Sequence, residues 1–169
     1  SFDAATQRWT VSSGGADIWG RSDAFRFTGQ AFTGDGTVSA RVVSLTNSNP
    51  WAKTGVMFRD GTAANARHAM TVVTPARGVA FQRRTTTNGT SAHTAGSAAT
   101  APRWLRVARS GSVFTGRESA DGATWTTIGS ATIAMPAAAH AGLCVTSHAN
   151  GTLATAVFEQ VAMAPTGGG

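Results

Sequence analysis

The chain has 169 residues, which is the length of one domain with a single hydrophobic core. Only 13% of its residues are charged, and no run has the length and periodicity of a long amphipathic helix, so an all-β class is favoured. The net charge is +6, but the arginines are scattered from Arg8 to Arg117, which argues against a nucleic-acid partner. No apolar run approaches the roughly 18 residues of a transmembrane helix, so no membrane partner is expected.

Short β-prone runs alternate with turn signals along the whole chain. Strands are predicted at residues 8–13, 23–29, 36–45, 51–59, 67–74, 78–85, 103–110, 112–119, 124–131, 140–147 and 151–163. The break from Pro75 to Gly78 predicts a hairpin, and Ser110-Gly111 and Asp121-Gly122 mark two more. A single helical turn is predicted at 63–66. About eleven strands predict a jelly-roll β-sandwich of two antiparallel sheets.

The two ends of the chain suggest a module of a longer protein. Residues 1–163 are predicted to form one sandwich, and residues 164–169, APTGGG, to begin a flexible linker. The chain starts at Ser1 without a charged and apolar leader. Cys144 is the only cysteine and lies in an apolar run, so a buried thiol is expected.

Alternation of side chains predicts a polar surface on neighbouring strands. Successive residues of a strand point to opposite faces, so Val56 and Phe58 are expected in the core, with Lys53 and Arg59 on the other face. By the same pattern Gln82 and Arg84 are expected to face solvent beside Arg59. These side chains form the floor of a candidate binding surface.

Two tryptophans are candidate stacking platforms for a sugar ring. Trp51 follows Pro50 in a loop of amide and hydroxyl side chains, and Trp19 lies in a Gly-rich segment. Burial in the core remains the alternative for both. His93 and His148 lie in polar loops and are candidate hydrogen-bonding partners of a ligand, with solvated loop residues as the alternative. The other tryptophans, Trp9, Trp104 and Trp125, are expected in the core.

Five segments together resemble the concanavalin A-like lectin/glucanase superfamily. They are residues 17–27, 34–60, 66–84, 119–125 and 146–161, and they are most similar to bacterial sandwich modules appended to secreted carbohydrate-active enzymes, including the C-terminal sandwich of some β-xylosidases. The resemblance implies a two-sheet jelly roll, export from the cell, glycan recognition and often a bracing calcium ion. Asp3 and Glu159 are the candidate calcium ligands, although such modules commonly carry Asp at the position of Glu159.

The acidic residues do not form a recognisable catalytic pair. Glycoside hydrolysis uses two facing carboxyl groups, whereas Glu118, Glu159 and six aspartates are dispersed along this chain. Serine-hydrolase and zinc motifs are missing from the sequence as well.

The sequence therefore predicts a non-catalytic carbohydrate-binding module of a secreted multidomain enzyme. Its predicted partners are a polysaccharide or oligosaccharide and a catalytic domain in the same parent chain. A laminin G-like protein-interaction or spacer domain is one alternative. A glycan hydrolase or lyase without a recognisable acid pair is the other.

Overall fold

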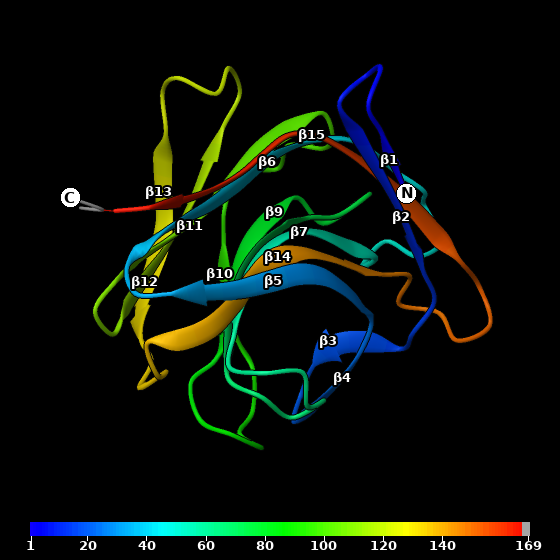
Figure 1. Cartoon of the computed structure of the whole chain (residues 1–169). Coiled ribbons are helices and arrows are strands. Elements are labelled where there is room, and N and C mark those ends of the chain that lie inside the picture. Colours follow the sequence, from blue (N-terminus) through cyan, green and yellow to red (C-terminus); the bar gives the residue numbers. More distant parts are fainter. Residues whose placement is uncertain (167–169) are drawn as a thin grey trace.

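Two large antiparallel sheets pack face to face as a jelly-roll sandwich, and a short hairpin lies against the outer side of one of them (Figure 1). This computed structural model describes residues 1–166. The prediction of an all-β sandwich is confirmed. Within residues 1–166 no helix is long and apolar enough to span a bilayer.

The strands are divided among three sheets. The seven-stranded sheet has the order β1 (Phe2–Asp3), β2 (Arg8–Ser13), β15 (Ala154–Pro165), β6 (Gly36–Leu45), β11 (Arg103–Ser110), β12 (Val113–Ser119) and β13 (Thr126–Thr132). The six-stranded sheet has the order β10 (Ala92–Ala95), β9 (Val79–Arg84), β8 (His68–Val73), β7 (Lys53–Arg59), β14 (Ala138–Thr146) and β5 (Arg26–Thr33). The hairpin pairs β3 (Asp17–Trp19) with β4 (Ser22–Ala24).

Most strand and turn predictions are confirmed, because alternation and turn residues agree with the observed pairing. The break from Pro75 to Gly78 joins the paired strands β8 and β9. Gly111 and Gly122 adopt positive φ angles of 59° and 77° in the hairpins on either side of β12. At 63–66 the structure has a hydrogen-bonded turn and not the predicted helical turn; Ala66 N–H donates to Ala63 O at 3.1 Å.

The C-terminal strand is longer than predicted. β15 continues to Pro165, and its residues Ala164 and Pro165 pair with Thr37 and Gly36 of β6. The prediction that a linker begins at Ala164 is therefore wrong for these residues, because the long strand β6 offers them backbone partners. Residues 167–169 of the predicted linker lie outside the described residues.

The main core fills the space between the two large sheets. Phe58 packs at its centre, with ring centroids 5.5 Å from Phe32 and 5.8 Å from Phe114 in edge-to-face contacts. Val56 and Phe58 belong to this core, as predicted. Trp104 is not in it: Leu105 and Val107 are core residues, so Trp104 lies on the opposite, outward face of β11.

A second core lies under the hairpin, on the other side of the six-stranded sheet. Ile18 of β3 packs there with five buried residues of the sheet, which are Met57, Met70, Val72, Ala80 and Cys144. Strands β7 and β8 are consequently buried on both faces. Cys144 is a buried thiol, as predicted, and its burial raises the pKa to about 12.

Candidate functional site

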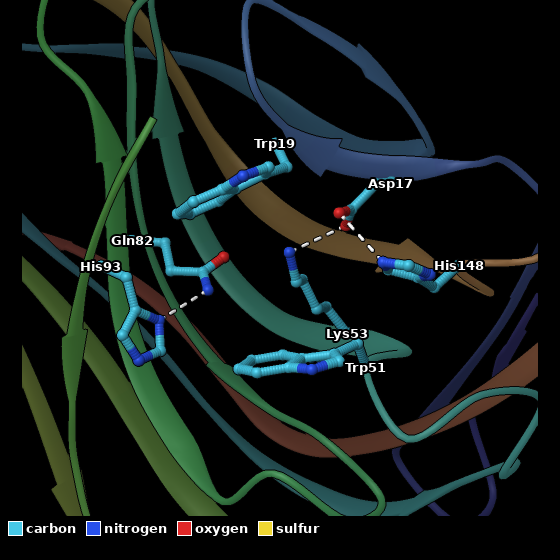
Figure 2. A pocket seen from close by; sticks show the side chains of 7 residues that line it. All are labelled: Asp17, Trp19, Trp51, Lys53, Gln82, His93 and His148. Atoms are coloured by element: carbon cyan, nitrogen blue, oxygen red, sulfur yellow. Dashed lines mark hydrogen bonds and ion pairs between the residues drawn. The ribbon is translucent and has the colours of Figure 1, made fainter. Parts of the chain in front are cut away.

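A pocket of about 490 Å³ opens beside the hairpin, on the outer side of the six-stranded sheet (Figure 2). It is lined by Asp17, Trp19, Trp51, Lys53, Gln82, His93 and His148. These side chains come from β3, the loop before β7, β7, β9, β10 and the turn after β14. The pocket unites six of the eight predicted ligand-binding residues, and its volume is ordinary for a small-ligand site.

The hairpin β3–β4 supplies one wall of the pocket. Its strands are joined by Gly20 and Arg21, and Gly20 has a φ of 59°, the left-handed conformation that the first position of a type II′ turn requires. Asp17 and Trp19 are two residues apart on β3 and share a face, while Ile18 between them packs into the second core. The burial of Ile18 thus turns both neighbours toward the pocket.

The two indole rings lie on opposite sides of the pocket, with the Lys53 ammonium between them (Figure 2). Lys53 Nζ is 5.3 Å from the ring centroid of Trp19 and 5.9 Å from that of Trp51. Trp19 is 40% exposed and Trp51 is half-buried. The Trp51 backbone N–H donates to Asn49 Oδ1 at 2.9 Å, which fixes the loop that carries the ring.

Asp17 connects the polar groups on one side of the pocket. Its Oδ1 accepts a hydrogen bond from Lys53 Nζ at 2.8 Å, and its Oδ2 lies 3.1 Å from His148 Nε2. Lys53 also donates to Ile18 O at 3.2 Å, so two of its three N–H groups have partners in the described chain. His148 has a φ of 55°, an uncommon backbone conformation for a residue with a side chain. Asp17 thus neutralises the buried ammonium and orients the imidazole.

Gln82 and His93 form a neutral pair on the other side of the pocket. The Gln82 amide nitrogen lies 2.9 Å from His93 Nδ1 and donates to it, which places the proton of the neutral ring on Nε2. Burial, assisted by the positive charges of Lys53 and Arg83, lowers the pKa of His93. Gln82 Oε1 is buried and has no hydrogen-bond partner within residues 1–166. Because buried acceptors are rarely left unpaired, this oxygen marks a place for a ligand donor.

The prediction that Gln82 and Arg84 face solvent beside Arg59 is wrong: Gln82 is only 2% exposed, and the two arginines are buried as well. Their exposed fractions are 1% and 0%, because the hairpin covers this part of the sheet. Asp23 of β4 lies between them: its Oδ2 accepts from Arg59 Nη1 at 2.8 Å, and its Oδ1 from Arg84 Nη2 at 2.7 Å. Both arginines lie beneath the hairpin and are not among the residues that line the pocket.

Arg84 fixes the hairpin to two neighbouring segments. Its guanidinium donates to Gly20 O at 3.0 Å, to Ala66 O at 3.1 Å and to Gly89 O at 3.0 Å. Burial alone would raise the pKa of Asp23, but the hydrogen bond from Arg84 and the nearby positive charges outweigh it and lower that pKa. Arg84 and the ionised Asp23 are therefore positioning residues that hold the hairpin carrying Asp17 and Trp19.

The two candidate calcium ligands are engaged in other contacts. Glu159 pairs with Arg41 and accepts from Arg8 Nε at 3.3 Å. Asp3 caps its own turn by accepting from the backbone N–H of Ala5 at 3.0 Å. Calcium takes six to eight oxygen ligands, and residues 1–166 hold no group of three or more acidic, His or Cys residues arranged for a metal. The calcium site stays a prediction that this arrangement does not favour.

The sequence prediction did not include Asp17 among the site residues. The sequence feature that could have identified Asp17 is its spacing from Trp19, since residues two apart on a strand share a face. That signal is weak in a three-residue strand, whose existence depends on packing against the distant sheet.

The comparisons with known proteins agree on the architecture. No protein-family model matches the sequence, and no curated protein matches it significantly. Among solved structures, a functionally unknown protein from Saccharomyces cerevisiae has a TM-score of 0.75 at 20% identity, over 99% of this chain and 93% of that chain. A GH43 protein from Bacillus licheniformis has a TM-score of 0.65 at 13% identity, over 89% of this chain and 31% of that chain.

Carbohydrate binding module CBM66 from Bacillus subtilis is similar along nearly its whole length. Its TM-score is 0.60 at 19% identity, over 94% of this chain and 95% of that chain. The likeness is one of fold. This chain has a jelly-roll sandwich that also occurs in carbohydrate-active proteins, and the chemistry of its pocket has to be argued from its own residues.

Proposed function

We propose that this chain is a non-catalytic carbohydrate-binding module of the concanavalin A-like lectin/glucanase superfamily, and that it holds a sugar ring between Trp19 and Trp51. The observation that carries the proposal is the unpartnered Gln82 Oε1, a buried acceptor in a pocket with two indole walls. Sugars combine apolar C–H faces, which stack on indole rings, with hydroxyl groups, which donate to an acceptor such as Gln82 Oε1. The fold shared with the carbohydrate binding module from Bacillus subtilis supports it.

The polar groups of the pocket suit a ligand with several hydroxyl groups. Gln82 Oε1 would accept one hydroxyl proton, while His93 Nε2–H and the third N–H of Lys53 would donate to hydroxyl oxygens. Asp17 and His148 form a fixed pair at the opposite side. Since Asp17 already compensates the charge of Lys53, the pocket favours a neutral sugar over an isolated anion.

The acids near the pocket support a non-catalytic role. Asp17 is the carboxylate among the lining residues, whereas glycoside hydrolysis uses two carboxyl groups about 5 to 9.5 Å apart. Glu118 is held by Arg103 at 2.6 Å and by the Ser97 hydroxyl at 2.5 Å, away from the pocket.

We further propose that the module tethers a secreted enzyme to polysaccharide. A tethered binding site raises the local concentration of substrate at a catalytic domain in the same chain. The similar region in the GH43 protein makes up 31% of that chain, so the fold occurs there beside further structure.

A glycan array followed by titration calorimetry tests the proposal. We expect a neutral oligosaccharide to bind, and Trp51→Ala to weaken it at least about tenfold through lost stacking. Gln82→Ala should weaken it as well, whereas Phe2→Ala, which removes an exposed ring from the seven-stranded sheet, should leave the affinity unchanged. An array without a glycan ligand, or unchanged binding by Trp51→Ala, would contradict the proposal.

Assays of the same purified chain distinguish the alternative functions. Release of reducing sugar or of unsaturated products by the purified chain would support a hydrolase or lyase. Failure to bind any glycan, combined with a correctly folded chain, would favour a laminin G-like interaction or spacer domain.

A further inference from the structure

A second polar surface lies on the outward face of the seven-stranded sheet, opposite the main core. It consists of Trp104, Arg106, Arg117 and Trp125, and is called the arginine-tryptophan face below. Because Leu105 and Val107 point into the core, alternation along β11 turns Trp104 and Arg106 outward. Arg117 of β12 stands directly opposite Arg106 in the strand register.

The aromatic rings of this face hold Arg106 in place. The Arg106 Cζ lies 3.9 Å from the ring centroid of Trp125, a close cation–π contact. Trp125 packs edge-on against Trp104, with ring centroids 6.5 Å apart. Gly122 allows this packing, since a Cβ at that position would lie 2.7 Å from a ring atom of Trp104. The guanidinium is therefore pre-organised and loses little freedom on binding.

Within residues 1–166 no acidic side chain forms a salt bridge with Arg106 or Arg117. Like charges at directly opposed positions repel, and Arg106 and Arg117 occupy such positions. Arg106 Nε is buried without a hydrogen-bond partner among the described residues. Burial, and then the charge of Arg117, lowers the pKa of Arg106.

We propose that the arginine-tryptophan face binds an anionic polysaccharide, with carboxylate groups accepting hydrogen bonds from Arg106 and Arg117. A planar guanidinium matches a carboxylate in bidentate geometry, and the partly exposed Trp104 and Trp125 offer apolar contact to sugar rings. Opposed residues on paired strands stand about 5 Å apart, so both guanidinium groups reach one sugar unit or two successive ones.

This site is separate from the pocket between Trp19 and Trp51. The pocket lies beyond the six-stranded sheet and the new face beyond the seven-stranded sheet, so the main core separates them. Two arginines beside two tryptophans form a local cluster, whereas nucleic-acid binding uses a long basic stripe along phosphates. The proposal does not depend on the function of the pocket.

Affinity electrophoresis through polygalacturonate tests it, with fully methyl-esterified polygalacturonan as the neutral control. We expect the intact protein to be retarded by the acidic polymer alone. Arg106→Gln/Arg117→Gln should weaken retardation at least about tenfold. The matched control Arg21→Gln/Arg26→Gln removes two charges from exposed positions elsewhere and should retain most of the binding. Trp51→Ala should bind as the unmodified chain does.

Three outcomes would overturn the proposal. The first is no retardation of the intact protein, and the second is equal weakening by the two double variants, which would indicate net charge alone. The third is stronger retention by duplex DNA with the same dependence on Arg106 and Arg117, which would make nucleic acid the partner. Thermal unfolding of both double variants verifies that each is folded.

Discussion

Two pairs of arginines stand on the two large sheets and have opposite roles. Arg59 and Arg84 flank His68 across three strands, lie under the hairpin β3–β4, and share the carboxylate of Asp23. Arg106 and Arg117 occupy directly opposed positions on β11 and β12, on the outward face of the seven-stranded sheet, where Arg106 packs on Trp125 and forms no salt bridge within residues 1–166. A buried charge requires a partner, whereas an outward one is solvated or available to a ligand.

A strand pattern therefore assigns a face to each arginine but not the environment of that face. The two pairs point away from the main core in their respective sheets. Whether that direction leads to solvent depends on another segment, here the one that carries Asp23. The role of each pair depends on whether the hairpin β3–β4 lies over it. The buried pair positions the pocket, and the outward pair is the one proposed to bind anions.

The strongest way to separate the pairs is to remove one member of each. Arg84→Ala removes one of the two arginine partners of the buried Asp23 and leaves the backbone carbonyls that Arg84 binds without their donor, so it should lower the free energy of unfolding by about 3 to 5 kcal/mol. Arg117→Ala should change it by no more than about 0.5 kcal/mol. Urea denaturation of both variants measures the difference. Equal effects would show that the two pairs are energetically alike.

The buried cluster should also make folding sensitive to acid. Burial, opposed by Asp23 and assisted by the charges of Arg59 and Arg84, lowers the pKa of His68 to about 3. In the unfolded chain the pKa is about 6.5, so between these values only the unfolded state binds the proton. Stability therefore falls as pH decreases through this window, by an amount on the order of 4 kcal/mol.

Denaturant titrations from neutral pH to pH 4 test this dependence, with His68→Asn as the control. The variant should show a shallower pH dependence whatever its stability at neutral pH. Asp23 adds a further loss at lower pH: its pKa is lowered in the folded chain, so its contribution is complete above the unfolded value of about 3.9 and disappears below it. A variant slope equal to that of the unmodified chain would contradict the assignment to His68.

For the outward pair, Arg106 and Arg117, we expect that removing one charge changes the stability by a smaller amount and in the opposite direction. Arg117→Gln removes a like-charge contact and should raise stability by about 0.2 to 0.5 kcal/mol at low ionic strength. The gain should vanish near 1 M salt, where the screening length is about 3 Å. Thermal unfolding at both salt concentrations measures it. A loss of stability at low salt would indicate that the two guanidinium groups do not repel each other.

The smallest expected effect concerns the predicted calcium site. Because Arg41 and Arg8 already compensate Glu159, a chelator should leave the melting temperature unchanged. A decrease after chelation would restore the metal hypothesis and show that Asp3 and Glu159 rearrange around an ion.

The sequence predicted the long strands well and the short ones poorly. β2, β6 and β11 match the predicted ranges because several alternating residues and flanking turns agree. The strands β1, β3, β4 and β10 were not predicted as separate elements. Each has four residues or fewer, which is too short for alternation of side chains to give a clear signal, although each pairs with a strand nearby in sequence. His93 lies on β10, so part of the pocket belongs to this unpredicted class.

The candidate site was predicted by residue type more than by geometry. Trp19 and Trp51 were named for their chemistry and Lys53 for its position in an alternating strand, and all three line the pocket. Arg84 was placed on the correct face of β9 but in the wrong environment. Its partner Asp23 is 61 residues away, and no local pattern reveals that contact. To predict that the hairpin β3–β4 covers Arg84, one would need the tertiary structure itself.

The burial of Cys144 beneath Ile18 gives the hairpin a built-in reporter. A thiol reagent attacks the thiolate and needs access to sulfur, so modification of this single cysteine requires the hairpin to lift or the chain to unfold. The rate of labelling therefore measures how often the wall of the pocket opens. A ligand bound between Trp19 and Trp51 would slow that rate, which turns a residue outside the pocket into a gauge of its occupancy.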